Sequence, residues 1–218
     1  HSFPPRRSSD LDMAIIVNPI TLSGATLIDT DLNGYTYIAN PQILSDNKIN
    51  QKGQRIFYTY TAIPQSIGAD SIPYITIMQV NKVLTKEPVF VEDNDAKDYG
   101  TDPIEISGQS ISKAHLNLRY TFLNGGNHLI PHSISLLIAK DAQPDARGYL
   151  SAELRHDAAD DLQLNANSGY VSFTLENMPG FKEGTLKGFK IKTKTIKNET
   201  DIVEVTMNNN RKSMNFNI

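Results

Sequence analysis

From Met13 onward the chain is dominated by short runs in which apolar and polar residues alternate, and Gly, Pro, Asn or Asp ends most of these runs. In residues 54–63, for example, Ile56 and Tyr58 fall on one face of an extended strand and Phe57 falls on the other. Alternation with a period of two is the pattern of β-strands. The sequence therefore predicts an all-β protein.

The first part of the chain holds five such runs, at residues 13–20, 24–30, 34–40, 54–63 and 74–84. The longest runs carry apolar or aromatic groups on both faces, which suits a sheet that curls and closes on itself. A five-stranded OB-like barrel is a common architecture of this size, and we assign it to residues 13–91. Residues 1–12, which are rich in Pro, Ser and Arg, are predicted to be a flexible N-terminal tether.

Residues 92–102 interrupt the strand pattern with five acidic side chains and one Lys. They show no hydrophobic period, so they are predicted to be a solvated acidic linker between two domains.

Strand-like runs resume after this segment, at residues 114–122, 132–140, 148–156, 169–175, 186–196 and 201–207. Turn residues separate them at intervals typical of an antiparallel β-sandwich, which we assign to residues 103–218. Only residues 156–164 are compatible with a short helix. Lys190, Lys192 and Lys194 share one strand face, a pattern that protects an edge or a solvent-facing surface from unwanted pairing.

Composition narrows the class of protein. Hydrophobic residues make up 39% of the 218 positions and charged residues 21%, which is enough apolar material for a folded core. The chain has no Cys, which excludes disulfides, thiolate metal sites and Cys nucleophiles. No apolar run approaches the roughly 20 residues that span a bilayer.

Residues 52–63 and 74–88 resemble the N-terminal domain of the NigD-like family of Bacteroidetes envelope lipoproteins. Residues 114–122, 133–139, 150–161 and 169–178 resemble its C-terminal domain in the same order. The resemblance implies an OB domain followed by a β-sandwich. It also implies export to the cell envelope, with a membrane attachment only through an N-terminal lipid anchor that this chain does not contain. The family carries no catalytic residues that could be transferred to this sequence.

Histidines are the main candidates for chemistry, because four of the five lie in the second domain. His128 and His132 have the i, i+4 spacing of zinc-binding helices, but Pro131 and the preceding Gly residues favour a turn, and the Glu of the HExxH motif is missing. A metal-dependent hydrolase centred on His128, His132 and His156 is therefore an alternative hypothesis. We expect no metal and no cofactor.

Arg155, His156 and Asp157 form the most concentrated polar group in the sequence. A guanidinium there could recognise an anion or a partner carboxylate, or it could pair with a neighbouring acid for a purely structural purpose. With His128 and His132 they are the candidate contact residues. The loops at residues 65–72, 124–132 and 157–167 are the candidate contact surfaces.

Charge argues against nucleic-acid binding, although OB barrels often bind single strands. Residues 13–91 hold five Lys or Arg against five acidic residues, and residues 103–218 hold thirteen against twelve. Polyanion binding requires clustered cations.

No phosphate-binding glycine loop and no nucleophile–base motif accompany these features. The sequence thus favours a non-catalytic binding or assembly module of the cell envelope, periplasmic or on the outer membrane, whose partner is an unidentified envelope protein or ligand. The family's association with a bacteriocin locus adds bacteriocin immunity as a second alternative.

Overall fold

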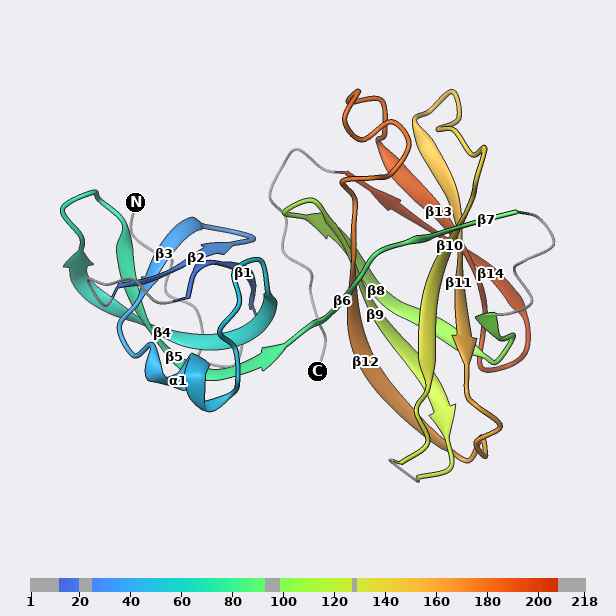
Figure 1. Ribbon diagram of the computed structural model, residues 1–218, viewed down its shortest axis with the longest axis horizontal. Helices are drawn as coiled ribbons and strands as arrows, with labels where there is room; N and C mark the ends of the chain where they lie inside the picture. Colours follow the sequence, from blue (N-terminus) through green and yellow to red (C-terminus); the bar gives the residue numbers. More distant parts are fainter. Residues whose placement is uncertain (1–11, 20–24, 93–98, 127–128, 208–218) are drawn as a thin grey trace. The chain divides into compact units, whose positions relative to one another are not determined.

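The computed structural model describes residues 12–19, 25–92, 99–126 and 129–207, and the chain forms two units that divide between Thr85 and Lys86 (Figure 1). The predicted tether therefore lies outside the described residues except for Asp12, and the predicted linker is described only at its two ends.

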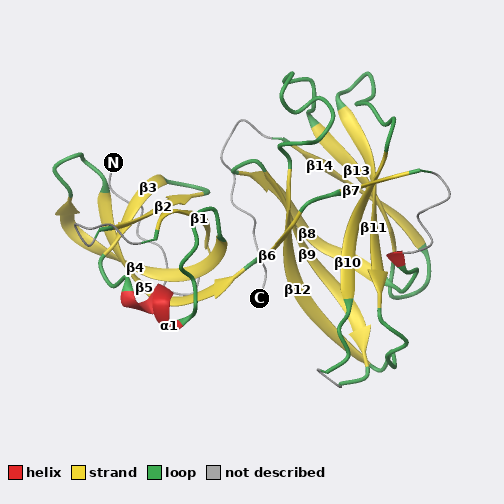
Figure 2. Ribbon diagram, in the orientation of Figure 1, coloured by secondary structure: helices red, strands yellow, loops and turns green. Residues whose placement is uncertain are grey.

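The first unit contains five barrel strands and one helix: β1 (Asp12–Asn18), β2 (Thr26–Thr30), β3 (Gly34–Ile38), α1 (Gln42–Asp46), β4 (Arg55–Ile67) and β5 (Pro73–Lys82). The strands close in the order β1-β2-β3-β5-β4, with β1 paired to β4. This confirms the predicted OB-like barrel. Helix α1, the red ribbon between β3 and β4 in Figure 2, was not expected, because five residues are too few to show a helical period.

The barrel closes because β4 serves two neighbours. Residues 55–58 pair with β1 on one side, and residues 56–67 pair with β5 on the other side. The β4–β5 register is irregular between Thr59 and Tyr60 and again between Ala62 and Ile67. The second irregularity accommodates Pro64, which has no backbone N–H to donate and is tolerated at such positions. The strand thus runs three residues beyond Pro64, to Ile67, although the sequence pattern suggested that it would end there.

Aliphatic side chains from all five strands and Leu44 of α1 fill the barrel. Arg55 is also fully buried, and its guanidinium binds both carboxylate oxygens of Asp31 at 2.7 Å. The alternation in β4 thus places a paired charge among apolar groups.

The second unit is a two-sheet sandwich. Its strands are β7 (Val89–Val91), β8 (Ile104–Ser112), β9 (His115–Asn124), β10 (Ser133–Ala139), β11 (Tyr149–Asp157), β12 (Asn165–Thr174), β13 (Gly188–Lys194) and β14 (Thr200–Thr206), joined at one edge by β6 (Leu84–Lys86). One sheet has the order β14-β13-β11-β10-β7 and the other β6-β12-β9-β8. This confirms the predicted sandwich. It also contains two parallel pairs, β7 with β10 and β11 with β13.

The division at Lys86 precedes the acidic segment at which the sequence suggested a boundary. Residues 89–91, assigned from the sequence to the barrel, form β7 and pair with β10 in the sandwich. A strand of three residues shows no readable alternation, so its pairing is decided by the neighbouring strand.

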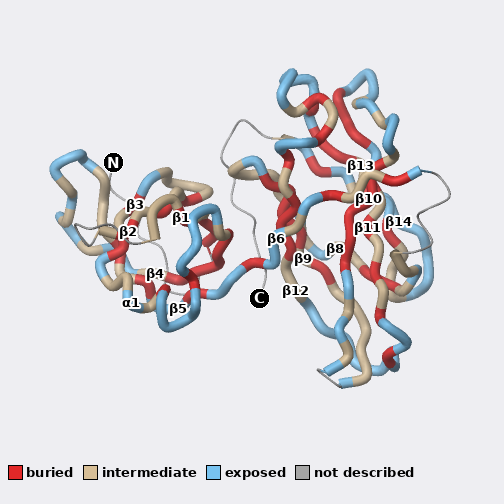
Figure 3. The backbone as a smooth tube through the Cα atoms, in the orientation of Figure 1, coloured by how far each residue is buried: buried red, intermediate tan, exposed pale blue. Residues whose placement is uncertain are grey.

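The sandwich core lies between the two sheets and is lined by buried side chains such as Leu118, Leu136, Phe173 and Phe189. Buried residues are coloured red along the strands of this unit in Figure 3. The Thr193 hydroxyl, on β13 of one sheet, donates a hydrogen bond to the carbonyl of Ile104 on β8 of the other. Among the described residues, no helix combines the length and apolarity that a membrane span requires.

The lysine row lies on the outer face of β13. Phe189 and Ile191, which alternate with the lysines, are fully buried. Because β13 lies between β11 and β14, the row marks a solvent-facing surface rather than an edge. The ammonium of Lys190 binds Asp145 at 2.7 Å and, with backbone N–H groups, lowers the pKa of that carboxyl to about 2.

Candidate functional site

Two of the candidate histidines meet where β10 begins and β11 ends. His132 immediately precedes β10, and His156 lies in β11 opposite Ile134 of β10. Residues two apart in an extended chain face the same side, so the His132 ring lies diagonally beside that of His156. Nδ1 of His132 is 2.9 Å from Nε2 of His156. His128 lies outside the described residues.

Asp161, in the loop between β11 and β12, extends this pair. Its Oδ2 atom is 3.0 Å from Nε2 of His132 and also accepts a hydrogen bond from the N–H of Gly125 at 2.9 Å. Its Oδ1 atom accepts from the N–H of Leu162. We call His132, His156 and Asp161 the His–Asp network. It joins the β9–β10 loop to the β11–β12 loop.

The network is shielded from solvent. His156 is 1% exposed and Asp161 is 9% exposed. The Phe122 ring meets both imidazoles edge-on, with ring centroids 5.2 Å and 5.5 Å away. Burial lowers the pKa of His156, and the N–H of Gly125 lowers the pKa of Asp161.

Hydrogen-bond geometry assigns the protons. Nδ1 of His156 faces the carbonyl oxygen of Pro103 at 3.0 Å and must carry a proton, because a carbonyl only accepts. The contacts between the two rings and from His132 to the Asp161 carboxylate need one proton each. The tautomer of each ring sets which atom donates in these two contacts.

Arg155 and Asp157 lie outside this network, because alternate residues of β11 face opposite sides. Arg155 pairs with Glu153 at 3.0 Å and donates to the carbonyl of Gly100 at 3.0 Å. Asp157 accepts from the N–H of Ala159 at 2.8 Å. Both side chains thus make local contacts that fix neighbouring backbone.

Within the described ranges, no group of three or more His, Cys, Asp or Glu side chains is placed to hold a metal ion. In the His–Asp network itself, the facing ring nitrogens are at hydrogen-bonding distance from each other. A shared proton there occupies the lone pair that a metal would require.

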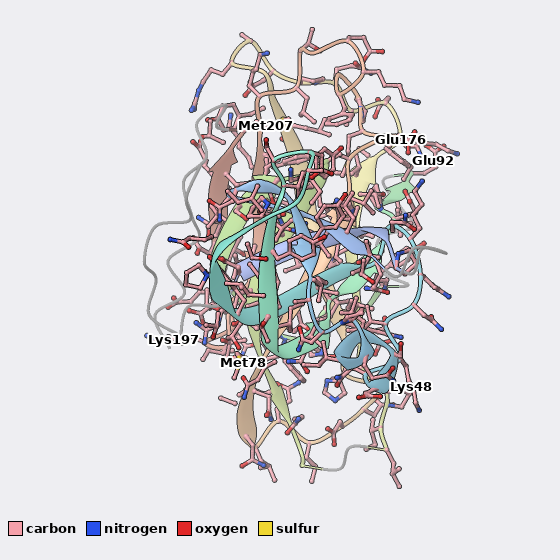
Figure 4. All side chains as sticks on the ribbon, turned by 90° about the vertical axis from the view of Figure 1, so that its left-hand side faces the viewer. Lys48, Met78, Glu92, Glu176, Lys197 and Met207 are labelled. Atoms are coloured by element: carbon pink, nitrogen blue, oxygen red, sulfur yellow. The ribbon has the colours of Figure 1, made fainter. Side chains whose placement is uncertain are left out.

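Three leucines in the two loops that the network joins are exposed. Leu129 lies in the β9–β10 loop, and Leu162 and Leu164 lie in the β11–β12 loop. We call them the leucine rim. Both loops extend to the lower end of the sandwich in Figure 1. Other large apolar side chains are exposed singly, such as Met78 on β5, labelled in Figure 4, and Ile202 on β14.

His132 and His156 are among the candidates that the sequence predicts, whereas Asp161 is not. The hairpin register of β10 and β11 could have paired the two histidines. Asp161 has no such signal, because it follows an irregular loop in which Ala159 and Asp160 have positive φ angles.

Residues 87–207 match the family model described as the NigD-like C-terminal beta sandwich domain. None of the curated proteins compared matches the chain.

Solved structures with the same architecture include a protein of unknown function from Bacteroides vulgatus, with a TM-score of 0.70, 19% identity and coverage of 91% of this chain and 90% of that one. A NigD-like immunity protein from Bacteroides caccae gives a TM-score of 0.61 at 15% identity, with 94% and 93% covered. A protein from Bacteroides fragilis, whose naming as a lipoprotein is provisional, gives 0.59 at 11% identity, with 91% and 97% covered. At such identities the similarity shows a shared fold.

Proposed function

Because this chain belongs to the NigD-like family, we propose that it acts as a non-catalytic binding or assembly module of the bacterial cell envelope. In this proposal the leucine rim and the two loops that carry it form the contact surface, and the protein is tethered through an N-terminal lipid anchor that precedes this sequence.

The observation that carries the proposal is the closed hydrogen bonding of the His–Asp network. Both ring nitrogens of His132 and both of His156 are engaged by each other, by Asp161 or by Pro103. A general base must have a nitrogen within reach of a substrate proton. The series of hydrogen bonds from Asp161 through His132 and His156 ends at the backbone carbonyl of Pro103, which cannot act as a nucleophile. A structural clamp accounts for this arrangement better than a reactive centre does.

The position of the clamp supports a binding role. It holds together two loops at one end of a sandwich, and binding residues are commonly placed on loops that a rigid scaffold supports. Large exposed apolar side chains gathered in one place mark interaction surfaces more often than single ones do. The leucine rim has three such side chains on the two loops that the network joins.

The names of proteins with the same fold support the proposal that this protein lies in the cell envelope. Proteins with this fold include one provisionally named a lipoprotein and one named an immunity protein. Both names suit exported proteins of the envelope.

Site-specific photo-crosslinking in intact cells tests the proposal. Benzoylphenylalanine at position 162 should give a discrete adduct with one envelope component, whereas the same residue at the equally exposed position 202 should not. Adducts at neither position, together with a stoichiometric transition metal in the purified protein, would instead support a metal-dependent hydrolase.

Bacteriocin immunity is a second candidate, favoured by the name of the Bacteroides caccae structure. It predicts that deletion of the gene makes the strain sensitive to the toxin of a neighbouring strain. In that case the adduct formed at position 162 should contain the toxin rather than a resident envelope protein.

A further inference from the structure

We propose that the leucine rim docks a protein segment in which apolar side chains are flanked by Lys or Arg. This inference rests on the proposed binding function and names the chemistry of the partner.

The apolar requirement follows from solvent exposure. Leu129 is 89% exposed, Leu162 is 64% exposed and Leu164 is 70% exposed. Covering a leucine side chain removes apolar surface from water, which favours association. Three leucines on two connected loops therefore offer substantial binding energy to an apolar partner.

Hydrogen bonds hold the described parts of the two loops in place. The N–H of Leu164 donates to the carbonyl of Asn124 at 3.1 Å, which ties the two loops together a second time beside the His–Asp network. Asp102 accepts from the N–H of Ala158 at 2.8 Å, and so fixes the start of the β11–β12 loop. A preorganised surface loses less entropy on binding.

Backbone strain in the β11–β12 loop also supports a binding surface there. Ala159 and Asp160 have φ angles of 51° and 61°, in the left-handed region that non-glycine residues seldom adopt. Such conformations persist where surrounding contacts enforce them, and they gather at binding and catalytic sites. Here they lie shortly before the exposed Leu162 and Leu164.

The charge of the two loops selects the partner. Residues 157–164 hold three aspartates and no Lys or Arg, and the described part of residues 124–132 holds no Asp, Glu, Lys or Arg. Asp161 is used in the network, whereas Asp160 is exposed beside the rim. Complementary potentials favour a partner with cationic groups around its apolar side chains.

The same charges disfavour the other apolar occupant, a membrane surface. Anionic lipid headgroups attract Lys and Arg near an inserting apolar group. The described parts of the loops supply an exposed carboxylate and no Lys or Arg there, so a protein segment fits better than a bilayer.

Peptide binding to the whole chain provides the test. Three labelled peptides of equal length combine Leu with Lys, Leu with Glu, and Ser with Lys, and fluorescence anisotropy follows their binding. Only the Leu/Lys peptide should bind. Replacing the three rim leucines together by Ser should weaken its binding at least about tenfold, a loss typical of central contact residues. Asp160→Asn should weaken binding several-fold at low salt and less at high salt.

Ile202→Ser is the matched control, since it removes an equally exposed apolar side chain from β14, and it should leave peptide binding unchanged. Equal binding of the Leu/Glu peptide, or unchanged peptide binding by the variant with three Ser residues in the rim, would overturn the inference. In that case a crosslinked partner at position 162 would still support the proposed binding function. Sedimentation with phosphatidylcholine or phosphatidylglycerol vesicles that depends on the rim leucines would assign the surface to membranes instead.

Discussion

Arg55 is fully buried in the barrel, and its charge is tolerated there because Asp31 binds it through both carboxylate oxygens. Bidentate pairing satisfies the planar guanidinium with two charge-assisted hydrogen bonds. Removing one member of such a pair leaves the other charge buried, which costs far more than losing an exposed ion pair.

We therefore expect Asp31→Ala to lower the free energy of unfolding of the barrel by roughly 3 kcal/mol. Native-state hydrogen exchange of the β1 and β4 amides would measure the change within that unit. Asp46→Asn is the matched control: its hydrogen bond joins two exposed side chains, Gln42 and Asp46, and it should have little effect. A similar small effect of both substitutions would show that the pair does not stabilise the barrel.

His156 links stability to pH. Burial lowers its pKa in the folded state below the ordinary value of about 6.5, so the unfolded chain takes up the proton first as the pH falls. The contribution of His156 to the stability of the sandwich should be fully present above about pH 6.5. It should be lost as the pH falls from about 6.5 through the lower pKa that His156 has in the folded state. A second ring proton would also place two N–H groups against each other between His132 and His156.

Chemical denaturation at a series of pH values tests this expectation, with NMR titration of the His156 ring as the direct readout. In His156→Gln the decrease below about pH 6.5 should be shallower than in the wild type. A ring that titrates at or above the ordinary value would contradict the assignment of burial as the dominant cause.

At the scale of elements, the segment before β8 is fitted closely to the end of β11. Gly100 has a φ angle of 75°, and a Cβ atom there would overlap the His156 carbonyl oxygen and the Asp157 backbone. Only glycine satisfies both the left-handed conformation and the close approach.

Gly100→Ala should therefore destabilise the sandwich by roughly 2–4 kcal/mol, from conformational strain and overlap together. Gly184→Ala separates the two causes, because Gly184 has a φ angle of 71° with nothing within 4 Å of the added Cβ. Its cost should be roughly 1 kcal/mol. Thermal unfolding followed by circular dichroism compares the variants, and equal losses would exclude overlap at Gly100.

Alternation of side chains was sufficient to predict the long strands, because a buried face imposes a period of two that the chain displays directly. It failed for α1 and β7, which are too short to display a period, and for the extension of β4 beyond Pro64. In the candidate site, hairpin register could have brought His132 to His156. The contribution of Asp161 depends on the unusual backbone of Ala159 and Asp160, which local sequence does not encode in a readable way.

For the whole molecule, we expect no useful affinity for nucleic acid despite the OB-like barrel. Residues 13–91 have equal numbers of cationic and acidic side chains, and Lys190 and Lys192 of the sandwich lie beside Asp145 and Glu153. Phosphate binding needs cations that are available in a cluster. Fluorescence anisotropy with labelled single-stranded DNA at physiological salt should detect no binding tighter than about micromolar, and tighter binding would contradict this prediction.

The short segment that enters the sandwich has a mechanical consequence. β6 forms the edge of one sheet and β7 the edge of the other, and the ammonium of Lys86, the last residue of β6, donates to the carbonyl of Ile134. Tension applied to the chain ahead of Leu84 would therefore pull on both sheets in succession. In a protein attached to a surface at its N-terminus, the pairing of β6 and then the pairing of β7 would resist that tension. We expect the β7 pairing to hold after the β6 pairing has broken.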